Sequence, residues 1–256
     1  GLLGTARYQA NIKMNDCANT GDIVVENDVN VRVLYVGGIL ANTLNIKLQY
    51  PGCYNSGSVE ARANTSAETY IGSIFGYSYN SDTGAGTTGI RNTGRVTYAG
   101  KSPLAYVGGY CGVYREGKHT VRFDSAASGV GEYKGEASIM ACVGGIGGLA
   151  GAVTTNAASN GGVATSVTKL DAVVAGKFQN GMTNNGNVTI YGYAPKVYVS
   201  GGFGYLTVKD GALSDLTNNG KVEVPDMTNA KNIPESFYIG GVFGYATMNT
   251  PYPTTD

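Results

Sequence analysis

The sequence predicts an all-β protein, a parallel β-helix (β-solenoid) with about 36 residues and three short strands per coil. Three observations predict this fold. Two short motifs recur along the chain in a fixed order, they recur at a nearly constant spacing, and the composition favours strands and turns. Repeat periods of about 20–50 residues are typical of solenoids, propellers and arrays.

The composition is that of a folded, strand-rich chain. The 256 residues include 40 Gly and 19 Tyr, and 42% of them are hydrophobic, which argues against disorder. Tyr, Val, Ile and Thr favour strands, whereas Asn, Gly and Ser favour turns. The formal net charge is zero, so the sequence provides no basic stripe for nucleic acid. No apolar run approaches the roughly 18 residues of a membrane span, and no signal peptide is visible.

The first motif is Asn-x-Gly-x-Val, with Ile in place of Val in the first copy. A degenerate copy lies at Ala127-Ser128-Gly129. The five clear copies begin at Asn19, Asn55, Asn92, Asn184 and Asn218.

The second motif is Tyr-Val-Gly-Gly-x-x-Gly, and its copies are spaced by 35, 36, 36, 56 and 40 residues. The opening segment from Gly1 to Gly4 resembles the end of a further copy, because Gly1 precedes Gly38 by 37 residues. We therefore expect residues 1–256 to be one repeat domain, a fragment of a longer solenoid, with an insertion or irregular coil near 154–178. The copies begin at Tyr35, Tyr70, Tyr106, Cys142, Tyr198 and Tyr238.

Each unit contains three extended stretches. One precedes the Asn turn, one follows it, and the third contains the Gly pair. No stretch has a helical period. A propeller or a sandwich is the alternative, but a propeller blade needs a regular fourth strand.

In stacked coils, equivalent residues lie about 4.8 Å apart, which lets Asn side chains form a hydrogen-bonded ladder. We expect this ladder at Asn19, Asn55, Asn92, Asn184 and Asn218, with the following Val pointing inward. The Gly pair would allow a bend or a close approach of two backbone segments.

These motifs resemble the GLUG-type repeats of bacterial surface and adhesin-like proteins, in particular those of gut Bacteroidetes. The resemblance covers nearly the whole chain, apart from residues 154–178. It implies a β-helix, export to the cell surface and a role in attachment, and it implies no catalytic residues. Ser73 and Ser200 depart from the Gly pair, and Ala127 departs from the Asn motif.

Candidate sites for chemistry are few. His119 is the one histidine, and we interpret it as a solvated loop residue rather than a general base. The carboxylates are scattered, and the position of Asp22 carries Ser58, Arg95, Asn187 and Lys221 in the other units, so it forms no acidic row. We therefore predict no catalytic residue, no metal site and no cofactor.

The tyrosines form two sets of equivalent positions. One set begins the second motif, and the other comprises Tyr77, Tyr205 and Tyr245, just after its last Gly. Exposed rings in such a row could stack on sugars or on a partner surface. A stacked ladder that stabilises the coil is the interpretation we favour. If a ligand face exists, we place it at Tyr77, Tyr205 and Tyr245 and beside the insertion.

Two secondary predictions concern cysteines and chain ends. Cys17 and Cys53 each lie two residues before a motif Asn, and we expect an inward column of free thiols that continues through Ile90, Met182 and Leu216. Terminal coils expose open edges, so we expect either a cap made by residues 249–256 or end-to-end contacts.

The sequence therefore predicts a non-enzymatic binding or adhesion module, located extracellularly or on the cell surface. Its expected partners are a host or bacterial surface protein or a glycan, without nucleic acid and without membrane insertion in this segment. A polysaccharide-acting β-helix enzyme (a lyase or glycosidase) and a purely structural surface stalk are the alternatives.

Overall fold

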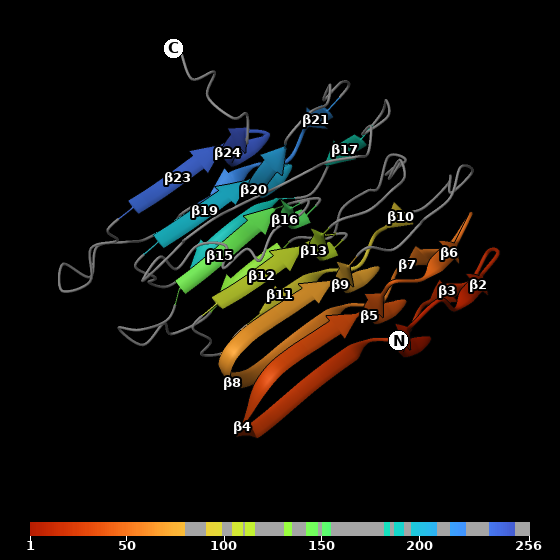
Figure 1. Cartoon of the computed structure of the whole chain (residues 1–256). Helices are drawn as coiled ribbons and strands as arrows, with labels where there is room; N and C mark the ends of the chain where they lie inside the picture. The colour runs from red at the N-terminus through yellow and green to blue at the C-terminus, as the bar shows by residue number, and fades with distance from the viewer. Residues whose placement is uncertain are drawn as a thin grey trace, which may run out of the picture.

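The fold was analysed in a computed structural model, which describes residues 1–79, 91–98, 104–109, 111–115, 131–134, 142–147, 150–154, 182–184, 187–191, 196–208, 216–223 and 236–248. Every regular element in these ranges is a β-strand. Every pairing between the described strands is parallel, and successive partners come from successive repeats. The predicted parallel β-helix is therefore confirmed (Figure 1).

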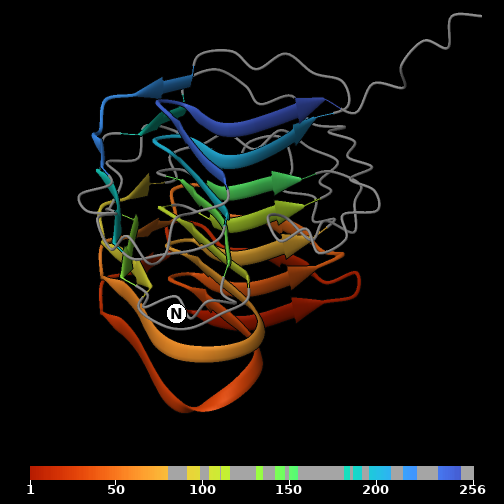
Figure 2. The ribbon, with the colours of Figure 1, turned by 90° about the vertical axis from the view of Figure 1, so that its left-hand side faces the viewer.

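The first long sheet contains the strands that follow the Gly pairs. Its seven strands lie one above the other from the N-terminal to the C-terminal end of the molecule (Figure 2). These strands were not predicted from the sequence. Their order is β1 (Leu3–Arg7), β5 (Leu40–Leu44), β9 (Phe75–Tyr79), β13 (Cys111–Arg115), β16 (Ala150–Thr154), β20 (Phe203–Val208) and β24 (Phe243–Met248).

The second long sheet has ten strands and contains the segments on both sides of a bend in each coil. In β4 (Ile23–Gly37) and β8 (Val59–Gly72), the strand after the Asn turn runs directly into the Tyr-Val-Gly strand. In later coils these two parts are separate strands. They are β11 (Val96–Tyr98), β14 (Gly131–Lys134), β18 (Val188–Tyr191) and β22 (Val222–Glu223) for the first part, and β12 (Leu104–Gly108), β15 (Cys142–Gly147), β19 (Lys196–Ser200) and β23 (Ser236–Gly240) for the second.

Short strands complete the coils. The Asn motifs form a three-stranded sheet and a two-stranded sheet, and a further pair precedes them in the first two coils. The three-stranded sheet comprises β3 (Ala18–Asn19), β7 (Tyr54–Asn55) and β10 (Arg91–Asn92), the two-stranded sheet comprises β17 (Met182–Asn184) and β21 (Leu216–Asn218), and the further pair is β2 (Asn11–Lys13) with β6 (Lys47–Gln49).

The register shows one repeat per coil. Tyr35 pairs with Tyr70, and Tyr70 pairs with Tyr106. Leu3 pairs with Leu40, so the opening segment occupies the place of the strand after the Gly pair, as its resemblance to a motif end predicts. A propeller needs antiparallel hairpins within each blade, and the described strands form none.

The core lies inside the coils, in three apolar clusters. The Val that ends the Asn motif points inward, and Val59, Val96 and Val188 are all fully buried. A second cluster around Leu40 and Phe75 lies beside the Gly pairs. The third cluster consists largely of tyrosines.

The last Gly of the second motif lets the two long sheets touch backbone to backbone. A β-carbon on Gly76 would lie 2.8 Å from the backbone nitrogen of Val36, in the preceding coil. Gly112 approaches Ile71, and Gly244 approaches Val199, in the same way. Since real β-carbons essentially never come so close, these three positions require glycine, whereas Ala41 occupies the equivalent position in the coil that precedes Gly76. The close approach predicted for the Gly pair is also present, because a β-carbon on Gly38 would clash with the Ser73 carbonyl oxygen in the next coil.

Several sequence predictions fall outside the described residues. They concern the insertion from residue 155 onward, His119, Ile90, Ala127 and the cap proposed for residues 249–256. In the described part of the chain, no helix is long and apolar enough to cross a membrane.

Candidate functional site

The asparagine corner is a continuous ladder in the first three repeats. Asn19 Nδ2 donates to Asn55 Oδ1 at 2.7 Å, and Asn55 Nδ2 donates to Asn92 Oδ1 at 2.9 Å. Each Nδ2 also donates to the carbonyl oxygen two residues later, at Gly21, Gly57 or Gly94. The side chain thus closes its own turn and joins two neighbouring coils.

The same turn occurs near the C-terminal end. Asn184 and Asn218 are in register between β17 and β21. Asn218 Nδ2 donates to the Gly220 carbonyl at 2.9 Å, and the Gly220 amide donates back to Asn218 Oδ1 at 3.2 Å. All five predicted ladder residues therefore lie in the short strands of the Asn corner.

A second set of polar contacts at this corner involves the residue after the motif Gly. Asp22 Oδ1 accepts a hydrogen bond from the Ser58 amide at 2.7 Å, and Asn187 Oδ1 accepts one from the Lys221 amide at 2.9 Å. The hydrogen bonds from Ser58 hold the pKa of Asp22 below its usual value. This carboxylate therefore holds neighbouring coils together.

The tyrosines pack in two rows of equivalent positions, which we call the tyrosine zipper. One row contains Tyr35, Tyr70, Tyr106, Tyr198 and Tyr238, and the other contains Tyr77, Tyr205 and Tyr245. Tyr70 stacks between Tyr35 and Tyr106, with centroid distances of 5.2 and 5.3 Å and interplanar angles of 6° and 2°. In the other row, Tyr205 and Tyr245 stack at 5.3 Å. The rows meet edge to face where Tyr70 contacts Tyr77 at 4.9 Å. This is the favoured geometry of packed aromatic rings.

The ligand face suggested for Tyr77, Tyr205 and Tyr245 coincides with this zipper. Tyr205 is buried, and Tyr77 and Tyr245 are half-buried. All three pack in the tyrosine cluster of the core, so a ligand could contact only the solvent-exposed edges of the half-buried rings of Tyr77 and Tyr245. Their role in ligand contact stays a prediction, and their packing role is what the structure shows.

The zipper also holds a polar group that sequence reasoning missed. Asn42 shares the register position of Tyr77, and its side-chain oxygen is buried without a hydrogen-bond partner among the described residues. Tyr70 Oη, in contrast, donates to Glu68 Oε2 at 2.7 Å. Burial is the main reason that the pKa of Tyr70 is raised well above its usual value, with smaller contributions from Tyr106 and Glu68.

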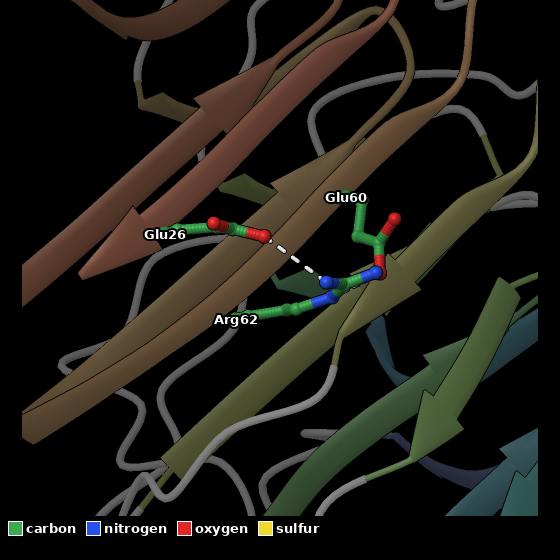
Figure 3. Close-up of polar contacts among 3 residues, drawn as sticks. All are labelled: Glu26, Glu60 and Arg62. Atoms are coloured by element: carbon green, nitrogen blue, oxygen red, sulfur yellow. Dashed lines mark hydrogen bonds and ion pairs between the residues drawn. The ribbon is translucent and has the colours of Figure 1, made fainter. Parts of the chain in front are cut away.

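The outward face of β4 and β8 carries exposed side chains. In β8 the burial alternates, with Val59, Ala61 and Ala63 inside and the residues between them directed outward. Arg62 lies between two acids, with its Nη1 3.0 Å from Glu26 Oε1 and its Nε 2.7 Å from Glu60 Oε1 (Figure 3). The period-2 alternation of small apolar and polar residues in 59–64 is the sequence signal that could have identified this face. We call Val24, Glu26, Glu60, Arg62 and Asn64 the outward patch.

The residue that ends the Asn motif is similar in successive coils, whereas the residue after it differs in type. The residues that end the motif, Ile23, Val59 and Val96, lie in register and point inward. The next residue is Val24 in the first coil, Glu60 in the second and Thr97, which is buried, in the third. Motif residues thus hold the coils together, and the side chains between them differ from coil to coil.

Cys17, Cys53 and Cys111 are free thiols, as predicted, while the side chain of Cys142 lies outside the described part. Met182 and Leu216 are in register further along the predicted column. Burial raises the pKa of Cys53 to about 11. Within the described ranges no group of three or more His, Cys, Asp or Glu side chains is arranged to hold a metal ion.

Comparison with protein families, curated proteins and solved structures finds no match to this chain. The resemblance to GLUG-type repeats therefore rests on the motifs alone.

Proposed function

We propose that this chain is a non-enzymatic binding module of the GLUG-repeat type, which acts outside the cell in attachment to a glycan or a surface protein. The observation that carries the proposal is that, within each coil, different residues serve the stacking and the outer surface. The motif residues stabilise the stack, whereas the position after the motif Val or Ile varies from Val24 to Glu60 to Thr97 in successive coils. Repeat proteins commonly bind through extended surfaces to which several repeats contribute.

The outward patch is the surface we propose for contact. It lies on two long neighbouring strands, and Val24 is 54% exposed beside the charged side chains of Glu26 and Arg62. Its exposed ion pairs add little to stability, so these side chains are available to exchange partners. A patch of this size would bind weakly, and repeated units would gain strength through multivalency.

The experiment measures retention of the chain on immobilised plant, host and bacterial polysaccharides and on host and bacterial surface proteins. The patch variant Glu26→Gln/Arg62→Gln/Asn64→Ala is compared with the zipper variant Tyr77→Phe/Tyr245→Phe, which alters the earlier candidate face. We expect the patch variant to lose retention and the zipper variant to keep it. Circular dichroism of both variants shows that the fold is intact.

Three results would contradict this proposal. Retention by no polysaccharide and by no surface protein would support a structural stalk. Loss of retention only in the zipper variant would place contact at the tyrosines. Release of new reducing ends or unsaturated sugars would show a polysaccharide-acting enzyme.

A further inference from the structure

Cys17 and Cys53 occupy equivalent places in the first two coils. Each precedes a short strand of the asparagine corner, where Ala18 pairs with Tyr54. The Tyr54 amide donates to the Cys17 carbonyl at 3.0 Å, so the coils are hydrogen-bonded at this point. Adjacent strands lie about 4.8 Å apart. This separation falls within the roughly 4.4–6.8 Å between α-carbons that a disulfide tolerates.

The backbone around the two cysteines is not regular strand. Asp16, directly before Cys17, has φ 52°, and Gly52, directly before Cys53, has φ 67°. Both cysteines lie between these left-handed residues and the two-residue strands of the corner. A regular parallel pair of strands disfavours the torsion that a disulfide needs. The side chains of these two cysteines are not held in that regular side-by-side arrangement.

The two thiols differ in accessibility. Cys53 is fully buried, and its Sγ donates to the Met14 carbonyl at 3.4 Å. Cys17 is half-buried, and its Sγ donates to the Asn15 carbonyl at 3.5 Å in a contact that is open to solvent. A reagent in solution therefore reaches Cys17 first, because the thiol of Cys53 is buried. An accessible thiol beside a second, resolving thiol is the usual arrangement of reversible redox sites.

We propose that Cys17 and Cys53 form a redox-active pair that closes to an intramolecular disulfide by exchange with a small-molecule disulfide such as glutathione disulfide. The Cys17 thiolate attacks one sulfur of glutathione disulfide, which breaks its S–S bond and releases one glutathione thiolate that takes up a proton. Cys53 then loses its proton to solvent and attacks Cys17 Sγ, which releases the second glutathione. Two protein thiols are oxidised, and one glutathione disulfide is reduced to two glutathione thiols.

The bond would link neighbouring coils across 36 residues of chain, the difference between positions 17 and 53. A cross-link of this kind restricts the unfolded chain and thereby stabilises the folded one. In the proposed extracellular setting, where disulfides persist, the pair would fasten the first coil to the second. The inference does not depend on what the protein binds.

The test treats the folded chain with glutathione disulfide, quenches free thiols with iodoacetamide and maps tryptic peptides by mass spectrometry. Cys17 lies in peptide 14–32 and Cys53 in peptide 48–62, so the proposed bond joins two separate peptides. We expect this pair to be the main product and to disappear with dithiothreitol. The variant Cys111→Ala is the matched control, because Cys111 is a buried thiol in another column, and it should still form the pair.

Two single variants separate the steps. Cys53→Ala should keep a stable mixed disulfide on Cys17, because the resolving thiol is missing. Cys17→Ala should leave Cys53 unmodified on the same timescale. A persistent mixed disulfide on Cys17 in the wild-type chain would overturn the proposal, as would a chain with no reaction or one in which Cys53 couples only to another cysteine.

Discussion

The asparagine corner and the tyrosine zipper join the same coils by different physical means. The corner uses directional hydrogen bonds between amides, and Asn55 and Asn92 are fully buried. The zipper uses ring stacking, and the column that contains Tyr77 has Val113 in the next coil. Stacking has no donor that must be matched, so a ring can be replaced, whereas a buried amide without its partner is costly. The corner should therefore be the less tolerant of the two.

The largest expected effect is at the centre of the ladder. Asn55→Ala removes the side chain that bridges Asn19 and Asn92 and leaves the Gly57 carbonyl without its side-chain donor. We expect a loss of about 3 kcal/mol in the free energy of unfolding, because each buried group left without a partner costs about 1–3 kcal/mol. Urea unfolding followed by circular dichroism measures this loss.

Asn19→Ala is the matched control at the first rung, where the side chain is half-buried. We expect a loss of about 1 kcal/mol there, because solvent replaces the missing bonds. Equal losses in the two variants would show that the ladder does not depend on burial.

The zipper predicts a smaller effect that appears at high pH. The pKa of Tyr70 is raised in the folded chain, so the folded state keeps its proton where the unfolded state, with a pKa of about 10, loses it. The contribution is fully present below about pH 10 and is lost as the pH rises above it. The wild-type chain should therefore lose stability above about pH 10, and Tyr70→Phe should lose less.

Tyr70→Phe should also cost about 1 kcal/mol at neutral pH, because it removes the hydrogen bond to Glu68 and keeps the ring stack. Urea midpoints at about pH 8 and about pH 11 give both quantities. An unchanged alkaline slope in the variant would mean that Tyr70 is not the group that titrates.

The sequence predicted the parts of the fold in which one residue type recurs at one place in the coil. The Asn corner, the inward Val and the close approach at Gly38 of the Gly pair all follow from residues whose chemistry allows few alternatives. The strands after the Gly pair were missed because their inward positions differ, as Asn42, Tyr77 and Val113 show. The outward patch was missed because its members share no residue type. Its charge pairing depends on which coils are neighbours, and a single repeat does not show this.

The stacking of coils in register is the central claim, and a distance between exposed corner residues tests it most directly. Spin labels at Thr20→Cys and Asn219→Cys, in a background without the native cysteines, sit beside the first and last described Asn residues of the corner. The register from Ile23 through Val59, Val96, Gly131 and Val188 to Val222 comprises five steps. Five steps of about 4.8 Å give roughly 24 Å. Pulsed electron paramagnetic resonance should yield one narrow distribution near that distance, and a broad distribution or one centred beyond roughly 40 Å would contradict the stacked solenoid.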